Sequence, residues 1–592
     1  MHRRFREANL DKPQPIQPSS QPLPVSLLFG VAVAVHLPLL AMELPLKSSQ
    51  ANFHIFMASH YLSHWFDPWN VKWYAGFSQT TYPPLSQQWV AVIARGIGLD
   101  MAYMAVQLAA ILILVAGVYR FARIWVSPRA ASFAALAAIF LGSESFLVYA
   151  DGQLATTLAA AILLNALPFL YEWVKRGRWL SFLKAAALLA AAAAAHRGTL
   201  VFGLCLLALP VLALVFFEKE GGRVSAVGFW SRTIAIAIFA GAAIGIVLLP
   251  LWIALLHSPL SRIPVPHPSR ANYILSPQWG FTYFVVPYGA LILALPFIFF
   301  RGSAIARLRP LLFGFWIAFL IGLGGTTSVG PALLGRAFDV LSMEHFSYLA
   351  TLLALPFVGV LAEELIARYS SRAVVGLAVL AFFTCGLAVA ASIYRPQQTA
   401  DFDVTPVAEW LNRGGHDRYR YFTLGFGNKI SRLAMLTDAG SVDGGWAPSR
   451  MLPELAGYGG GPLTDAKNFG AHGFDALRAM LKDADSYGVK WVFVRDRSYD
   501  PLLYFAGWQA VDSLEDNTIV VWTKDGVPPA APINSPQMPP AWQGLMWGIC
   551  PFAGSIIAIL LLLIPGKKER AENLAEPVLA GDENPIFGRL VS

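Results

Sequence analysis

Long apolar segments recur along almost the whole chain and constrain its fold more than any other feature. A helix needs about 20 apolar residues to cross the hydrocarbon core of a bilayer. Of the 592 residues, 56% are hydrophobic and only 14% are charged, against about 25% charged in an average soluble domain. The sequence therefore predicts an all-α polytopic membrane bundle of about twelve spans. The candidate segments are 24–45, 101–119, 130–149, 153–172, 180–195, 198–217, 231–255, 281–300, 307–325, 345–365, 373–393 and 542–565.

The basic residues indicate how these segments are oriented. The net charge is +8, but Lys and Arg lie at segment ends and not in one stripe, which favours topology signals over a nucleic-acid surface. Each cluster falls at a boundary that simple alternation makes cytoplasmic. The clusters are 3–6, 120–129, 175–178, 301–309, 368–372 and 567–570. We expect both termini in the cytoplasm of a bacterial plasma membrane, with the first segment retained as a helix because no small-residue cleavage site follows it.

A stretch of soluble composition interrupts the apolar pattern before the last segment. Residues 403–415 open as a capped helix, 472–489 have apolar residues at helical spacing, and three short segments have strand character. This order predicts a small extracytoplasmic α/β domain. The expected division is a basic tail 1–23, a transmembrane domain 24–394 with a large first loop 46–100, the α/β domain with its Pro-rich linker 395–540, a last helix 541–566 and a tail 567–592.

The first loop is too polar and aromatic to cross a bilayer. Its composition is typical of chain at the headgroup level, so we expect it to rest on the membrane surface. Proline and glycine divide it into two short interfacial helices, at about 52–65 and 84–97. Its aromatic residues include Trp65, Trp69, Trp73, Tyr74 and Tyr82.

The same loop resembles the first extracytoplasmic loop of GT-C type glycosyltransferases, the multi-pass enzymes that use polyprenyl-phosphate sugars. It is most similar to bacterial members with a soluble domain near the C-terminus, including the 6-pyruvoyl-tetrahydropterin-synthase-related membrane family. The resemblance implies a polyprenyl-phosphate sugar as donor and an extracytoplasmic glycan, lipid or protein as acceptor. It implies no certain cofactor and leaves room for a divalent metal ion. The residues that carry it are Phe53, His54, Phe56, Trp69, Gly76, Tyr82, Pro83, Pro84 and Leu85.

The chain departs from the family at the position of the catalytic acid. Sugar transfer to a hydroxyl needs a base for the acceptor and a positive partner for the departing phosphate. In GT-C enzymes the base is typically an Asp a few residues before the position of His54, where this chain has Gln50, Ala51 and Asn52. The base must then come from elsewhere, and the missing Asp also motivates an alternative: a non-catalytic GT-C like protein that binds or exports lipid-linked polysaccharide.

Three other acids are candidates for the base. Glu43 lies at the outer end of the first segment, where its other interpretation is a side chain reaching to the interface. Asp151 lies in a short outer loop, 143–153, and otherwise serves as an N-cap. Glu344 precedes another span, where a helix N-terminus also favours a carboxylate.

Several residues are candidates for substrate binding. His196 and Arg197 break an apolar stretch, and such a pair is expensive in a membrane unless it faces a polar cavity. Arg336 is a further phosphate partner, and Arg262 and Arg270 flank an outer loop that could close over a donor. His54 and Tyr82 belong to the first-loop motif. Asp443 and Trp446 are weaker candidates for a sugar contact.

Two further classes are less favoured. His60 and His64 have the i, i+4 spacing of a metal pair, but no Glu follows His60 as in HExxH, so no metal site is assigned. An ion-coupled transporter is weaker still, because acids buried mid-span are scarce and paired broken helices are not evident.

Overall fold

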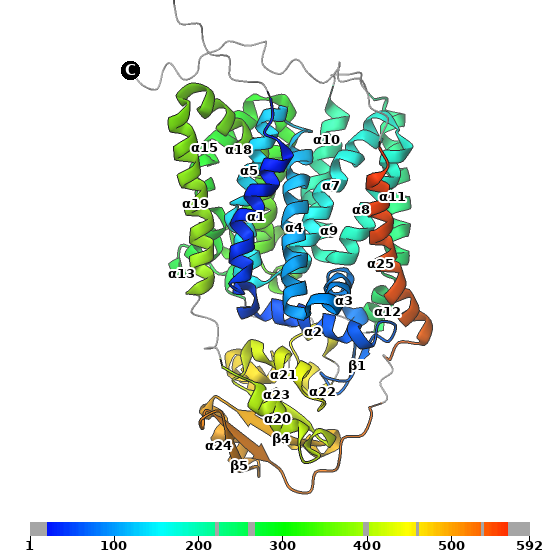
Figure 1. Cartoon of the computed structure of the whole chain (residues 1–592), viewed down its shortest axis with the longest axis vertical. Helices are drawn as coiled ribbons and strands as arrows, with labels where there is room; N and C mark the ends of the chain where they lie inside the picture. The colour runs from blue at the N-terminus through cyan, green and yellow to red at the C-terminus, as the bar shows by residue number, and fades with distance from the viewer. Residues whose placement is uncertain are drawn as a thin grey trace, which may run out of the picture.

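The structure is a computed structural model that describes residues 21–218, 224–257, 267–394, 402–450, 452–457, 461–533 and 538–565. A bundle of roughly parallel helices forms the larger part, and a small α/β unit lies beyond one end of it (Figure 1). We call this the sheet-side end of the bundle. The opposite end carries the basic clusters around residues 120–129, 175–178, 301–309 and 368–372, and we call it the basic end.

Eight helical stretches in the described residues are long and apolar enough to cross a membrane, or nine if one bent pair counts as a span. Six of them are single helices: α4 (Leu99–Ala122), α7 (Leu154–Arg176), α11 (Ala226–Val247), α18 (Glu344–Tyr369), α19 (Ser371–Ile393) and α25 (Ala541–Leu563). The seventh, Pro128–Asp151, combines α5 (Pro128–Ile139), α6 (Gly142–Ser145) and η3 (Phe146–Asp151). The eighth, Arg197–Phe217, combines α9 (Arg197–Gly203), η4 (Leu204–Ala208) and α10 (Leu209–Phe217).

Shorter or bent helices account for the remaining predicted segments. Pro277–Tyr288 and α15 (Leu291–Ala304) are related by a 65° bend. The others are α1 (Val25–Ala41), α8 (Trp179–Ala195), α12 (Leu249–His257), α13 (Pro277–Gly280), α14 (Val286–Tyr288), α16 (Arg309–Gly322) and α17 (Val329–Leu334). Every apolar segment predicted from the sequence overlaps one of these helices or the eight longer ones.

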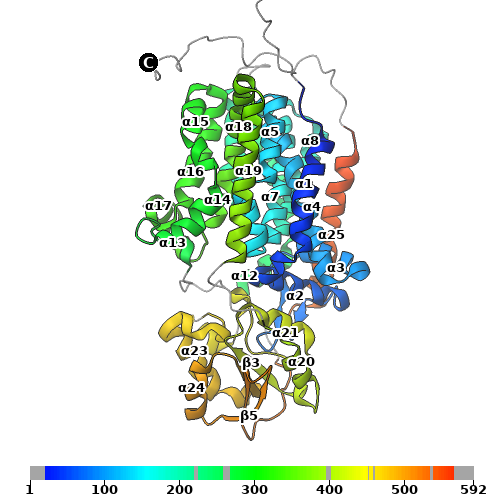
Figure 2. The ribbon, with the colours of Figure 1, turned by 60° about the vertical axis from the view of Figure 1, so that its left-hand side comes forward.

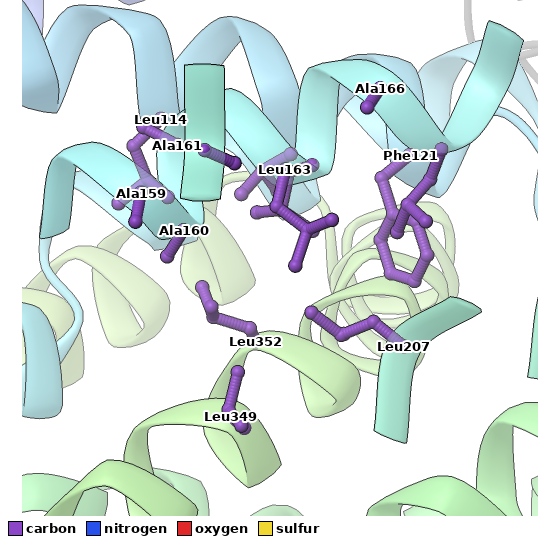
Figure 3. Close-up of a cluster of buried hydrophobic side chains, with 14 of the residues drawn as sticks. Leu114, Phe121, Ala159, Ala160, Ala161, Leu163, Ala166, Leu207, Leu349 and Leu352 are labelled. Atoms are coloured by element: carbon purple, nitrogen blue, oxygen red, sulfur yellow. The ribbon is translucent and has the colours of Figure 1, made fainter. Parts of the chain in front are cut away.

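Small residues let the central helices pack closely. An added Cβ at Gly117 of α4 would lie 2.7 Å from Asn165 Nδ2 of α7, and close backbone approach of this kind is how helices associate in lipid. Figure 3 shows side chains from α4, α7, η4 and α18 meeting in one buried cluster, Leu114, Leu163, Leu207 and Leu352 among them. The outer helices α11, α19 and α25 instead expose apolar faces, as lipid-facing helices do.

The chain breaks between α8 and α9 as the sequence predicted. His196 has an extended backbone (φ −157°, ψ 110°), and its Nδ1 accepts from the Thr199 backbone N–H at 3.3 Å, which caps α9. The outer loop predicted at 143–153 is wrong, because residues 142–151 continue as α6 and η3. The apolar residues 146–150 are buried there, and burying them kept the segment helical.

The first loop folds against protein on both sides. Ser48 caps α2 (Ser49–Ser63) by accepting from Ala51 N at 3.1 Å, and α3 (Leu85–Ile97) follows the Pro-Pro turn. Trp73, Tyr74 and Tyr82 are buried in one cluster with residues of the α/β unit. Protein therefore covers the large apolar rings that the sequence predicted to lie at the headgroup level. Strands β1 (Trp69–Asn70) and β2 (Phe77–Ser78) pair between the two helices.

The α/β unit is built on a four-stranded sheet of order β3-β4-β6-β5. Its first two strands are parallel and the other pairs antiparallel. The strands are β3 (Arg420–Leu424), β4 (Val489–Val494), β5 (Gln509–Leu514) and β6 (Ile519–Thr523), and the helices are α20 (Thr405–Asn412), α21 (Ile430–Leu436), α22 (Pro453–Ala456), α23 (Gly470–Lys482) and α24 (Asp500–Phe505). Both views place α21 toward the bundle and β5 on the far side (Figures 1 and 2).

Arg432 of α21 joins the α/β unit to the bundle. Its Nε donates to Asn52 Oδ1 at 2.6 Å, and its Nη1 donates to both oxygens of Asp100, at 2.7 and 3.0 Å. Such charge-assisted pairing fixes orientation as well as adding energy. Asn428 Nδ2 also donates to the Lys47 carbonyl at 2.8 Å. The loops beside α21 therefore face the sheet-side end of the bundle.

Candidate functional site

A row of aromatic and imidazole rings crosses the sheet-side end of the bundle. The Tyr82 ring lies 5.7 Å from the His54 ring and 6.4 Å from the His196 ring. The His196 ring stacks on His345 at 5.9 Å between centroids. These rings come from the first loop, the α8–α9 break and the start of α18, so residues far apart in sequence meet here.

His54 is a buried, neutral member of this row. Its Nδ1 lies 2.9 Å from the Gln87 side-chain amide, whose oxygen accepts from Nδ1–H when the amide nitrogen donates to the Pro83 carbonyl. Burial lowers the pKa of His54 to about 3, because the charged ring is poorly solvated there. Its Nε2 has no hydrogen-bond partner in the described part of the chain.

Arg197 supplies a positive charge beside Tyr82. Burial raises the pKa of the Tyr82 phenol above its usual value, and the nearby Arg197 charge partly offsets this. One Arg197 nitrogen, Nη1, is buried and finds no acceptor among the described residues. A buried guanidinium nitrogen without an acceptor is costly to leave unpaired, so this position suits an anionic ligand.

Glu344 is a buried carboxylate next to the same row. Its Oε1 lies 3.9 Å from His267 Nε2, and its Oε2 has no partner within the described ranges. Arg270 and His345 also lie close enough to interact with it electrostatically. His345 in turn contacts Thr156 of α7, with 3.4 Å between Nε2 and Oγ1.

The other predicted site residues lie apart from this cluster or at its margin. Asp151 is half-buried at the end of η3, before Gly152 and Gln153, and Gln153 rather than Asp151 precedes α7 as its N-cap. Glu43 and Arg336 are exposed, and no described contact joins either to the cluster. Arg262 lies outside the described residues. The structure thus brings together His54, Tyr82, His196, Arg197 and Glu344.

Sequence reasoning missed several contributors. His345 follows Glu344 directly, and the run 342-SMEHF-346 was the available signal. Gln87 and Thr156 carried no signal, because their roles depend on contacts between distant segments. In the described residues no group of three or more His, Cys, Asp or Glu could hold a metal ion. His60 and His64 stack at 4.8 Å, and His60 Nε2 lies 2.7 Å from the Asp67 carbonyl oxygen.

Asn52 is one of the three residues, 50–52, where the first-loop resemblance expects a catalytic acid, and it belongs to the joint between the bundle and the α/β unit. Its Oδ1 accepts from Arg432, and its Nδ2 donates to the carbonyls of Leu46 and Ser48 at 3.0 and 2.8 Å. All these contacts are structural. Of the three acids predicted as the base, Glu344 is the most deeply buried and the one that lies beside the cluster.

The α/β unit contributes Trp446 to the cluster. The Trp446 ring contacts Tyr82 edge-on at 4.9 Å and Phe53 at 5.6 Å. Its Nε1 is buried without a partner in the described portion of the chain. Asp443 is also buried, and its Oδ2 accepts from Thr464 N at 2.9 Å, which makes it a support of the unit's own fold.

An apolar groove of about 520 Å³ lies in the bundle. It follows α4 from Val106 to Arg120 and is closed by residues of α1, α7, α8 and α25. Its lining includes Leu85, Trp89 and Ile93 of α3, and Leu85 is separated from Tyr82 only by the two prolines. A rise of 1.5 Å per residue gives the groove a length of about 20 Å along α4.

The multi-helix bundle, its first loop of two short helices and its appended α/β unit are consistent with the GT-C fold of polytopic membrane glycosyltransferases. The structure of ArnT from Cupriavidus metallidurans bound to undecaprenyl phosphate is similar to this chain, with a TM-score of 0.50 at 12% identity over 86% of this chain and 99% of that one. Its apo form is also similar, with a TM-score of 0.50 at 13% identity over 80% and 92%.

A third solved structure is arabinofuranosyltransferase AftD from Mycobacteria, with a TM-score of 0.49 at 14% identity. The match covers 85% of this chain and 40% of AftD, so the chain spans well under half of that protein's length. No protein-family model and no curated protein sequence matches the chain.

Proposed function

We propose that this protein is a membrane glycosyltransferase that moves a sugar from a polyprenyl-phosphate donor to an extracytoplasmic acceptor. The observation that carries the proposal is the buried Arg197 guanidinium with an unpaired nitrogen. The same bundle also holds a long apolar groove and has a fold similar to that of ArnT. A charged nitrogen and an apolar groove together suit a ligand that has an anionic head group and an apolar tail. The similar ArnT structure holds undecaprenyl phosphate, which supports the same class of lipid here.

In this proposal the isoprenoid tail lies in the groove and the phosphate lies against Arg197. In this arrangement the rings of Tyr82 and Trp446, which contact each other, face the sugar, since aromatic faces suit sugar rings. Glu344 is the proposed base that takes the proton from the acceptor hydroxyl. His267, His345 and Arg270 surround it, and their positive or titratable groups favour the ionised carboxylate that a base needs.

The proposed membrane arrangement follows from charge. Short loops rich in Lys and Arg favour the cytoplasm, so the basic end is proposed to lie there. With about twelve spans, both termini are then cytoplasmic and the α/β domain at 395–540 lies outside. The cluster would then open to the extracytoplasmic side. The bacterial plasma membrane is the compartment that this arrangement fits. No metal ion has a role in the proposal.

Binding of undecaprenyl phosphate by the full-length protein tests the donor site. Native mass spectrometry of the wild type should show a bound lipid phosphate, and Arg197→Ala should weaken it at least about tenfold, because a charged hydrogen bond contributes about 1.5–3 kcal/mol. The affinity of Arg197→Lys should lie between those of the wild type and Arg197→Ala, since Lys keeps the charge but lacks the paired N–H donors of a guanidinium. The control is Arg123→Ala, an exposed arginine at the basic end. Equal binding by wild type and Arg197→Ala would contradict the proposal.

A second candidate function is a non-catalytic protein that binds or exports lipid-linked polysaccharide. The structural role of Asn52 favours it, because the acid that the family resemblance expects is replaced by a residue of the joint. Turnover separates the two. If the protein is an enzyme, polyprenyl-phosphate sugars from host membranes should be consumed by the wild type and not by Glu344→Gln. A binder leaves them intact with either protein.

A further inference from the structure

A second cavity lies within the α/β unit, apart from the ring cluster. It has a volume of about 370 Å³ and is lined by Gly425, Thr464, Asp465, Lys467, Asn468, Arg495, Asp496 and Arg497. Gly425 directly follows β3, and Arg495 directly follows β4. These are the two parallel strands of the sheet, and ligands of α/β folds bind beyond the carboxyl ends of parallel strands.

The backbone at this edge is arranged so that the two strand ends come close together. Gly425 has φ +81°, and an added Cβ would lie 2.7 Å from Asp496 Cβ. Only glycine adopts this conformation at little cost and leaves the space open. The Gly425 N–H donates to the Thr464 carbonyl at 2.7 Å, which fixes the segment 464–468 as the third wall of the cavity.

Some of the charged lining residues are already paired. Lys467 forms an ion pair with Asp496, and Arg497 forms one with Asp500. Asp465 and Arg495 are the lining charges for which the described residues provide no ion-pair partner. The Arg495 guanidinium lies over the Phe402 ring at 4.3 Å, and its Nε is buried with no acceptor in the described residues.

Asp465 is available to accept hydrogen bonds. No described residue donates to its carboxylate. Burial and the neighbouring Asp443 raise the pKa of Asp465 to about 6, although Lys467 opposes this. A hydroxyl donor would relieve part of this cost by stabilising the ionised form.

The balance of charge selects the kind of ligand. The ion pairs of Lys467 and Arg497 neutralise their charges. The remaining lining charges, Asp465 and Arg495, are of opposite sign, so neither an anion nor a cation is favoured. A neutral molecule rich in hydroxyl groups satisfies both kinds of lining group, because hydroxyls donate to carboxylates and accept from guanidinium and amide nitrogens. The volume lies at the small end of ligand pockets and suits about one or two sugar rings.

We propose that this cavity binds a neutral saccharide through Asp465, Asn468 and Arg495. The same strand-end loops face the bundle, since Asn428, three residues after Gly425, donates to the Lys47 carbonyl. The further assignment of the saccharide as part of the acceptor glycan rests on the proposed glycosyltransferase function.

Saturation-transfer NMR on the full-length protein in lipid nanodiscs, free of glycoside detergent, tests the site. The neutral probes are methyl glucoside and methyl galactoside, and the anionic probes are glucuronate and inorganic phosphate. The neutral probes should bind the wild type, and Asp465→Asn should weaken them at least about fivefold, the equivalent of one lost hydrogen bond. Asn468→Ala, at an exposed position, should weaken them similarly. The matched control is Asp485→Asn, an exposed carboxylate outside the cavity, which should bind as the wild type does.

Three results overturn the inference: no neutral probe binds the wild type, both cavity variants bind as the wild type does, or the anions bind more tightly than the neutral sugars. If wild-type protein binds undecaprenyl phosphate but no sugar, this inference fails and the proposed donor site stands. If it binds sugar at Asp465 but no lipid phosphate, the saccharide site stands and the proposed transferase function fails.

Discussion

At the scale of single residues, Asn52 shows what an amide can do that a carboxylate cannot, which is to donate hydrogen bonds. Its amide nitrogen donates to two carbonyls while its oxygen accepts from Arg432. An aspartate could keep the Arg432 contact, but it has no donor for the carbonyls of Leu46 and Ser48 and would lie against them as an anion. The amide therefore suits the joint between bundle and α/β unit, and a general base must come from another residue.

His54 makes the folded protein sensitive to acid. Unfolded histidine takes up a proton below pH 6.5, whereas folded His54, with its pKa lowered to about 3, stays neutral. Protonation therefore favours the unfolded chain, and stability falls as pH drops from 6.5 toward 3. At pH 5 the loss relative to pH 8 is about 2 kcal/mol.

The test compares melting temperatures of the detergent-solubilised protein at pH 8 and pH 5. His54→Asn removes the titrating ring, so its deficit against the wild type should shrink by several degrees at pH 5. The control is His64→Asn, at an exposed position near the end of the same helix. A deficit for His54→Asn that is unchanged or larger at pH 5 would show that His54 is not the acid-sensitive group.

Single residues were predictable where the local sequence conflicts with its surroundings. His196 and Arg197 interrupt an apolar run, and that conflict alone indicated the break between α8 and α9. The stacking of His345 on His196 and the contact of Trp446 with Tyr82 had no such signal. These pairs join residues more than a hundred positions apart, and periodicity reports only which face of an element is apolar.

At the scale of elements, apolar length predicted the helices well, because a membrane leaves each span little choice but to be helical. Element ends were less predictable. The sequence predicted an outer loop at 143–153, yet residues 142–151 are helical. Residues 146–150 are buried there, and Glu144 is buried and accepts from the Tyr348 hydroxyl at 2.5 Å. In the α/β unit, the positions of β3, β4 and β6 were indicated by the sequence, whereas β5 was missed. The adjacency of β3 and β4, which creates the cavity, depends on a long crossover.

Substitution of Gly425 tests how much stability depends on the close approach of the ends of β3 and β4. Gly425→Ala should destabilise the protein for two reasons, the positive φ and the contact with Asp496 at 2.7 Å. Gly507 is a matched control, because its φ is +83° and an added Cβ meets nothing within 4 Å. Gly507→Ala should cost about 1 kcal/mol, and Gly425→Ala about 1–3 kcal/mol more from overpacking.

Hydrogen exchange of the full-length protein measures this difference where it arises. Peptides covering β3 and β4 should exchange faster in Gly425→Ala than in Gly507→Ala, while peptides from α4 and α7 stay as in the wild type. Equal exchange of β3 and β4 in the two variants would mean that Asp496 moves aside easily, and that the strand ends are not held closely together.

At the scale of the whole molecule, the two ends of the bundle differ in chemistry. The basic end carries arginine and lysine with a few acidic partners, such as Glu218, which pairs with Lys175 and Arg307. The sheet-side end carries the ring cluster, Glu344 and the α/β unit. A donor that enters from lipid and an acceptor that enters from water would meet at the sheet-side end, so the proposed function requires that end to face outward.

Cysteine labelling of intact cells decides the sidedness directly. In a background with Cys205, Cys385 and Cys550 replaced by alanine, Ala506→Cys places a thiol on the exposed far side of the α/β unit, and Ser371→Cys places one at the basic end between α18 and α19. A membrane-impermeant maleimide should label Ala506→Cys in spheroplasts and should label Ser371→Cys only after lysis. Both positions are exposed, so accessibility within the protein is matched and the membrane alone separates them. Labelling of Ser371→Cys in sealed spheroplasts with protection of Ala506→Cys would put the ring cluster in the cytoplasm, where it could not serve an extracytoplasmic acceptor.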